Sequence, residues 1–139
     1  RAWTVQSYEA AKWAERNLPA DAVLAMKDAG AFGYFSRRRV VNVDGLVNGF
    51  EYQDSLRAGH FEGFLRRKGV EYYVQHAMPD RPDITAGRYD TLRFESYSHL
   101  YDRAGGVLPL ARSDEVYRSK PFAVGTDSCV FLIWRMPSR

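Results

Sequence analysis

The sequence predicts an α/β fold: a mixed sheet in two or three layers, with a parallel βαβαβ first half followed by antiparallel strands. Three observations lead to this prediction. Short apolar runs alternate with helical patterns up to residue 75, a segment rich in proline and aspartate follows, and the remaining residues alternate between polar and apolar types. The first pattern builds parallel strands joined by right-handed crossovers, whereas the last is typical of antiparallel strands.

A helix is predicted near the start of the chain, where small and apolar residues recur at helical spacing. Ser7 is placed to cap this helix, and Pro19 closes it. Its buried face is expected to consist of Ala10, Trp13, Ala14 and Leu18.

Three apolar runs in the first half are predicted as strands: residues 22–27, 39–43 and 70–75. The first is typical of a strand covered on both faces of a parallel sheet, and the second is rich in β-branched residues. Between them, residues 31–36 are expected to form a short helical turn. From Phe50 the apolar spacing is helical again, and Gly59 divides it into two short helices.

The second half is predicted to be a loop or lid followed by antiparallel strands. Residues 76–87 contain Pro79 and Pro82, which disfavour both a helix and a central strand. Turns are expected at Gly105-Gly106 and near Gly125. Strands are expected at residues 91–97, 107–110, 115–119 and 128–136, with the apolar stretch 130–134 near the centre of the sheet.

Composition narrows the classes of function. With 139 residues the chain is predicted to be a single domain that buries its own core. Its 20 basic and 17 acidic side chains are spread along the sequence, which argues against nucleic acid as a partner. A single cysteine, Cys129, excludes an internal disulfide. No apolar run approaches the roughly 20 residues that a membrane span requires.

Two aspartates follow the first two predicted strands. Asp28 comes after the first strand and Asp44 after the second. Ligands of open α/β sheets bind at the carboxyl ends of the strands, so a polar ligand or a metal could lie between the two carboxylates if the strands are neighbours. The alternative is that each aspartate caps the following turn, beside Gly30 and Gly45. Asn48 follows Asp44 by four residues and is expected either to share its ligand or to bond with it.

Aromatic and basic residues between these strands add to the candidate site. Tyr34 could stack on a sugar ring, although aromatic residues at such a junction more often pack in the core. The basic runs at residues 37–39 and 66–68 could face anionic head groups or a lipid phosphate, or could form a solvated face with local ion pairs. An arginine fork matches phosphate geometry, and Arg37 is the preferred phosphate-binding residue because it stands at the start of the RRVVN region.

Neither a metal site nor a cofactor is predicted. His60, His76 and His99 show no metal-ligand spacing with each other or with Cys129. Cys129 precedes an apolar strand and is expected to be a small buried side chain. Signatures of serine hydrolases, phosphate loops and dinucleotide binding are absent from the sequence, so no covalent mechanism is predicted.

The stretch from Asp28 to Asn48 resembles one protein family. It contains DAG at 28–30, GYFS at 33–36, RRVVN at 38–42 and DGLVN at 44–48. This pattern is similar to the soluble C-terminal extracytoplasmic domain of bacterial multi-span glycosyltransferases, relatives of the dolichyl-phosphate-mannose protein mannosyltransferases. The resemblance covers residues 3–74. It implies a domain on the periplasmic side of the cell membrane, attached to a membrane-embedded remainder of the same chain and close to lipid head groups or a lipid-linked sugar. It supplies no catalytic residue.

Three hypotheses follow from the sequence. The favoured one is a non-catalytic accessory domain that helps to bind an acceptor, a lipid-linked sugar or a partner through Asp28, Tyr34, Arg37, Asp44 and Asn48. The second is a small α/β enzyme that carries out metal-assisted phosphoester chemistry at Asp28 and Asp44. The third is a structural or protein-interaction module, which would show a large exposed apolar patch and no polar pocket at the strand ends.

Overall fold

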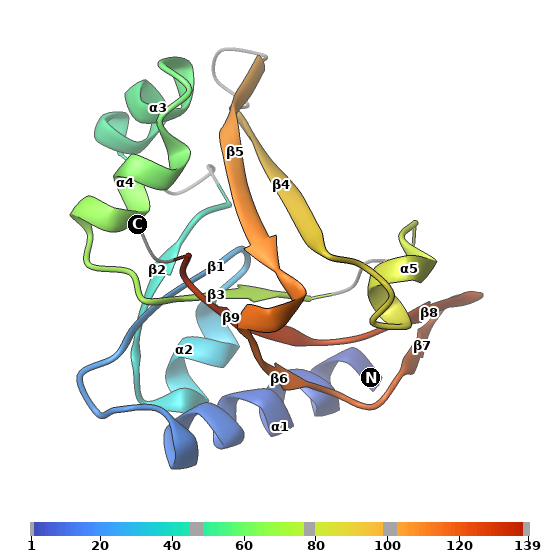
Figure 1. Ribbon diagram of the computed structural model, residues 1–139. Helices are drawn as coiled ribbons and strands as arrows, with labels where there is room; N and C mark the ends of the chain where they lie inside the picture. Colours follow the sequence, from blue (N-terminus) through green and yellow to red (C-terminus); the bar gives the residue numbers. More distant parts are fainter. Residues whose placement is uncertain (1, 45–48, 77–79, 99–102, 138–139) are drawn as a thin grey trace.

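The computed structural model shows a mixed sheet with helices on both sides (Figure 1) and describes residues 2–44, 49–76, 80–98 and 103–137. Its helices are α1 (Ala2–Asn17), α2 (Gly30–Ser36), α3 (Phe50–Arg57), α4 (Phe61–Arg67), α5 (Pro82–Thr85) and the 3₁₀ turn η1 (Arg112–Asp114). Its strands are β1 (Val23–Met26), β2 (Arg39–Asn42), β3 (Tyr72–Gln75), β4 (Thr91–Ser98), β5 (Arg103–Ala111), β6 (Glu115–Arg118), β7 (Phe122–Val124), β8 (Asp127–Cys129) and β9 (Leu132–Arg135).

The central sheet has five strands in the order β2-β1-β3-β9-β6. β1 pairs in parallel with β2 on one side and with β3 on the other. β9 joins β3 in antiparallel orientation, and β6 pairs with β9 in the same way. The predicted mixed α/β fold is therefore confirmed, with parallel strands first and antiparallel strands after them.

The sheet is the middle of three layers. Along β1, Leu24 and Met26 pack against α1 and α2, whereas Ala25 faces the opposite side. That opposite side is covered by α3, α4 and the β4–β5 hairpin, and Trp134 of β9 is fully buried there. Figure 1 shows α1 and α2 below the sheet and the other group above it. Side chains of successive strand residues point to opposite faces, so each strand contributes to both cores.

Gly105 and Gly106 lie inside β5, so the predicted turn at this position is wrong. Both glycines are required by close packing. A Cβ on Gly105 would lie 2.6 Å from Leu56 Cδ2, and one on Gly106 would lie 2.5 Å from the carbonyl oxygen of Gly59. Gly106 also has a φ of +113°, a conformation that other residues rarely adopt. The two glycines let β5 approach α3 and the α3–α4 turn.

The other differences concern where elements begin and end. α1 starts at Ala2, so Ser7 is a buried residue within the helix and not its cap. A short helix, α5, forms where only a loop or lid was predicted, with Pro82 in its first turn. The predicted strand at 128–136 is two strands, because β8 pairs with β7 while the amide of Phe131 donates to Ser119 Oγ at 2.8 Å. β7 was not predicted.

Candidate functional site

The predicted aspartates lie at neighbouring strand ends. β1 and β2 are adjacent and parallel, with Met26 opposite Asn42, so Asp28 and Asp44 both follow the carboxyl edge of the sheet. After β1 the chain enters α2 on one face of the sheet, whereas the next helix after β2 is α3 on the other face. In a sheet that begins β2-β1-β3, the strand order reverses between β1 and β3, and ligands of open α/β sheets bind at the carboxyl ends of the strands at this point. The predicted adjacency of the two strands is confirmed, whereas a ligand shared by Asp28 and Asp44 stays a prediction.

Asp28 lies beside a histidine that follows β3. Its backbone has a φ of 54°, in the left-handed region where aspartate is one of the better-tolerated residues. Its Oδ2 lies 3.8 Å from Nε2 of His76, and its side chain remains 58% exposed. Burial lowers the pKa of His76, and the Asp28 carboxylate opposes this shift only in part. The Nδ1 atom of His76 is buried, and no group of the described residues forms a hydrogen bond with it.

Asp44 is engaged with its own strand. Asn42 Nδ2 donates to Asp44 Oδ2 at 3.0 Å, and the amide of Asp44 donates to Asn42 Oδ1 at 3.3 Å. This pair ties Asp44 to the preceding strand, whereas the predicted alternative was a cap on the following turn; residues 45–48 of that turn lie outside the described residues. Asn48 lies outside the described residues, so its predicted pairing with Asp44 stays a prediction. No finding tests whether any of the five predicted residues binds a ligand.

Tyr34 and Arg37 both point into solvent. Tyr34 is 78% exposed, so it does not pack in the core as aromatic residues at such a junction usually do. Arg37 ends α2 in a left-handed conformation, and its 79% exposed side chain lies 3.5 Å from Glu15 Oε2. Arg38 has the structural role instead, because it donates to the carbonyl oxygens of Glu15 and Leu18, both at 2.8 Å. Arg37 is thus the more accessible of the two adjacent arginines.

A groove of about 270 Å³ runs between α1 and α2. Its lining is almost entirely apolar. The residues around it are Trp3, Thr4, Val5, Ser7, Tyr8, Ala31 and Phe35. The rings of Tyr8 and Phe35 meet edge to face across it, with centroids 5.0 Å apart, and Phe35 contacts Tyr34 in the same way at 5.1 Å. Tyr34 therefore extends the aromatic rim of this groove.

Trp3 joins the groove to the carboxyl edge of the sheet. It lines the groove and also packs edge to face on His76, with ring centroids 5.4 Å apart. His76 in turn lies beside Asp28, so Trp3 stands between the apolar groove and these polar groups at the strand termini. The combined site consists of an apolar channel and an acidic, histidine-containing end. This arrangement suits a ligand with an apolar portion and a hydroxyl-bearing head.

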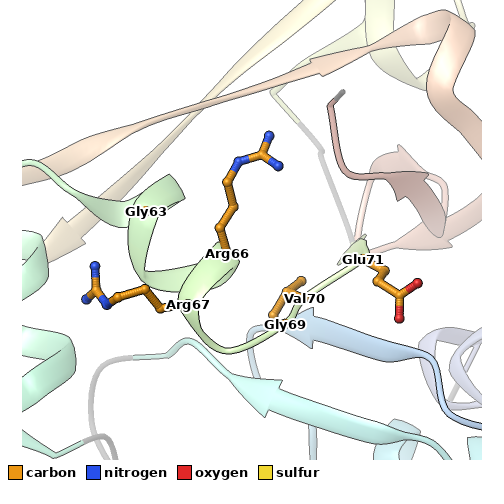
Figure 2. A pocket seen from close by; sticks show the side chains of 6 residues that line it. All are labelled: Gly63, Arg66, Arg67, Gly69, Val70 and Glu71. Atoms are coloured by element: carbon orange, nitrogen blue, oxygen red, sulfur yellow. The ribbon is translucent and has the colours of Figure 1, made fainter. Parts of the chain in front are cut away.

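The side chains of the second basic run are engaged in local contacts. Figure 2 shows Arg66 and Arg67 beside a pocket of about 650 Å³, pointing away from each other. Arg66 donates to Glu62 and to the carbonyl oxygen of Pro137, and Arg67 donates to Ser55. Lys68 pairs with Glu51 at 2.9 Å. These local contacts agree with the alternative predicted for residues 66–68, a solvated face with local ion pairs.

Within the described residues, no group of three or more His, Cys, Asp or Glu side chains is arranged to hold a metal ion. Cys129 is fully buried, as predicted. Among the helices of the described ranges, none combines the length and apolar character needed to cross a bilayer.

Comparison with known proteins places the chain in a family. Residues 1–126 match a family described as a domain of unknown function, DUF8728. The chain belongs to this family. No curated protein and no solved structure matches the chain. For this DUF8728 domain, the resemblance to glycosyltransferase tail domains therefore stays a prediction.

Sequence reasoning missed the α1 side of the site. Trp3, Val5 and Tyr8 were left out because the helix was predicted to begin at Ser7. The spacing of Trp3, Ser7 and Ala10 continues the helical pattern toward the N-terminus, and this signal could have extended the helix. His76 was considered only as a metal ligand. Its place after the third strand, at the same edge as Asp28, was the available indication.

Proposed function

We propose that this DUF8728 domain is a non-catalytic binding module that receives the apolar chain of a lipid-linked sugar in the α1–α2 groove. The observation that carries the proposal is the groove itself, which is almost entirely apolar and whose lining residue Trp3 packs on His76 at the carboxyl edge of the sheet. An isoprenoid chain offers only carbon and hydrogen atoms, so a groove whose exposed surface is almost entirely apolar suits it. The domain would act as an accessory to an extracytoplasmic glycosyltransferase reaction.

The polar end of the groove gives the ligand an orientation. Asp28 and His76 present a carboxylate and a buried imidazole, which suit the hydroxyl groups of a sugar better than a phosphate. Arg37 and Lys27 are the exposed cations on the α2 side of the sheet, and either can approach a phosphate from solvent. The resemblance to membrane glycosyltransferase tails supports the same class of ligand.

The test is a titration with geranyl phosphate, a short water-soluble prenyl phosphate, followed by tryptophan fluorescence. Trp3 lines the groove, so saturable binding should change its emission, and Trp3→Phe should remove most of that change. Ala31→Phe fills the groove from the exposed side of α2 and should weaken binding about tenfold or more. Ala58→Phe, at an exposed position at the end of α3, is the matched control. Absent binding, or equal affinity of the two variants, would refute the proposal.

The exposed aromatic residues also match the protein-interaction alternative, which expected an apolar patch. Asp28 and His76 form a polar site at the strand ends, and the protein-interaction alternative predicted none there. Their presence therefore favours the ligand-binding function. The enzymatic alternative, with Asp28 and Asp44 as metal ligands, predicts saturable binding of Mg²⁺ that Asp28→Asn abolishes. Calorimetric titration with Mg²⁺ separates it from the accessory function.

A further inference from the structure

Exposed apolar side chains gather on one face of the molecule. Among the described residues, the large apolar side chains with notable exposure are Val5, Tyr8, Tyr34, Phe35, Phe50 and Val124. The first four of these belong to α1 and α2 and surround the groove, whereas Phe50 is on α3 and Val124 is on the β7–β8 hairpin. Val5 and Tyr8 line the groove together with Phe35, and Tyr34 touches Phe35. We call these four side chains the α1–α2 apolar rim.

The chemistry of the rim favours a lipid surface over a protein. The groove inside the rim is almost entirely apolar, so it offers a protein partner almost no hydrogen bonds, whereas lipid hydrocarbon requires none. Tyrosine and tryptophan, which have an apolar body and a polar tip, are the residues that concentrate at membrane–water interfaces. Tyr8 and Tyr34 in the rim, with Trp3 in the groove, are of this type.

Charges around the rim are mixed. Lys27 and Arg37 are exposed at the two ends of α2, and Arg37 is 79% exposed despite its contact with Glu15. The exposed carboxylate of Asp28, just before α2, offsets part of this positive charge. Attraction to anionic lipids should therefore be secondary, and insertion of the rim side chains should dominate the interaction.

We infer that the α1–α2 apolar rim docks on the surface of a lipid bilayer, with the groove opening toward the hydrocarbon region. The inference rests on the proposed function, because it identifies the surface from which the groove would receive its lipid ligand. The rim side chains enter the interfacial region, while the sheet and the α3–α4 layer stay in water. An isoprenoid chain can then pass from the bilayer into the groove without crossing water.

The experiment is flotation of the domain with vesicles that contain no prenyl lipid. Vesicles of phosphatidylcholine alone measure the insertion of apolar side chains. Vesicles of phosphatidylcholine mixed with phosphatidylglycerol add the attraction to anionic lipids. The test variant is Val5→Ser combined with Tyr34→Ser. The control is Phe50→Ser combined with Val124→Ser, because Phe50 is 79% exposed against 78% for Tyr34, and Val124 is 40% exposed against 51% for Val5. All four side chains are exposed, so both variants should keep the fold, which circular dichroism checks.

The wild-type domain and the control variant should float with both kinds of vesicle. The test variant should lose affinity about tenfold or more, because two apolar side chains no longer leave water. Failure of the wild-type domain to float, or equal affinity of the test and control variants, would overturn the inference. So would a dimer in sedimentation equilibrium that the test variant abolishes, since it would assign the rim to a second copy of the chain.

The two proposals fail separately. Ala31→Phe fills the groove but leaves the four rim side chains in place, so it should abolish geranyl phosphate binding and preserve flotation. Flotation of the wild-type domain without geranyl phosphate binding would refute the lipid-linked ligand and keep the bilayer contact. Geranyl phosphate binding without flotation would refute the bilayer contact alone.

Discussion

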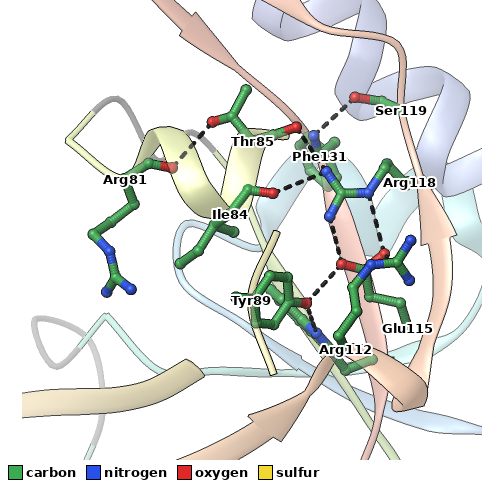
Figure 3. A network of polar contacts seen from close by, with 10 residues as sticks. Arg81, Ile84, Thr85, Tyr89, Arg112, Glu115, Arg118, Ser119 and Phe131 are labelled. Atoms are coloured by element: carbon green, nitrogen blue, oxygen red, sulfur yellow. Dashed lines mark hydrogen bonds and ion pairs between the residues drawn. The ribbon is translucent and has the colours of Figure 1, made fainter. Parts of the chain in front are cut away.

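Replacing Glu115 by glutamine should destabilise the domain, because this carboxylate joins three elements through a buried network (Figure 3). Its side chain is only 4% exposed. Oε1 accepts hydrogen bonds from Arg118 Nη2 and Tyr89, both at 2.6 Å, and Oε2 lies 3.2 Å from both Arg118 Nε and Arg112 Nη1. Arg118 also donates to the carbonyl oxygens of Ile84 and Thr85, at 2.9 Å each, and thereby fixes α5.

The magnitude follows from the geometry of these bonds. Glutamine has one acceptor oxygen, so whichever way its amide turns, an NH₂ group faces donors of the two arginines or of Arg118 and Tyr89. Each charge-assisted bond contributes about 1.5–3 kcal/mol. Arg118 is 24% exposed and Arg112 is 46% exposed, so water relieves part of the loss. We therefore expect the free energy of unfolding to fall by about 3 kcal/mol, at the low end of the range of about 3–5 kcal/mol for a broken buried ion pair. The melting temperature should fall by roughly 10 °C.

Urea unfolding followed by circular dichroism measures this change in the free energy of unfolding. Glu9→Gln is the control, because Glu9 is exposed on α1 and such a surface change should stay within about 0.5 kcal/mol. Hydrogen exchange gives a second readout, since amides of α5 should exchange faster once Arg118 is no longer oriented. If Glu115→Gln and Glu9→Gln had the same small effect, the network would not hold these elements together.

Three further predictions concern residues outside this network. Gly106→Ala should lower the free energy of unfolding, measured in urea, by at least about 2 kcal/mol. The new Cβ would lie 2.5 Å from the carbonyl oxygen of Gly59, and the φ of this residue is +113°. An unchanged free energy of unfolding would contradict that packing. Tyr73→Phe should be neutral or stabilise the fold by up to about 1 kcal/mol, because the buried Tyr73 hydroxyl has no hydrogen-bond partner among the described residues and its removal relieves a desolvation cost. A clear loss of stability would indicate a hydrogen bond to the hydroxyl. His76 has a lowered pKa in the fold, so protons favour the unfolded state and its contribution to stability is lost as the pH falls below the unfolded pKa of about 6.5. His76→Gln should therefore lose less stability than the wild type between about pH 7.5 and pH 5, and parallel pH profiles would refute the assignment.

The parallel half of the fold was predictable because its signals are local. Each of β1, β2 and β3 is a short apolar run, and Gly59 marks the break between α3 and α4. Two parallel strands joined by a helix have few arrangements, so the neighbouring ends after Asp28 and Asp44 followed from the order of elements.

The remainder depended on contacts between distant residues. Gly105 and Gly106 have the composition of a turn, but their function is to let β5 approach Leu56 and Gly59. The bonds that connect Tyr89, Glu115 and Arg118 join separate elements, and nothing local in the sequence marks them. Exposure of Tyr34 also depends on tertiary packing, because the same aromatic residue would be buried if another element covered α2.

The position of the groove follows from the layering of the fold. With β1 between β2 and β3, the two crossovers run in opposite directions, so right-handed connections place α2 on one face and α3 with α4 on the other. α1 packs on the same face as α2, so a seam must form between them. α2 has only seven residues, and it presents the small side chain of Ala31 to that seam. The short helix therefore leaves room for an apolar ligand, and because α2 starts just after Asp28, the seam meets the carboxyl edge of the sheet at Trp3 and His76.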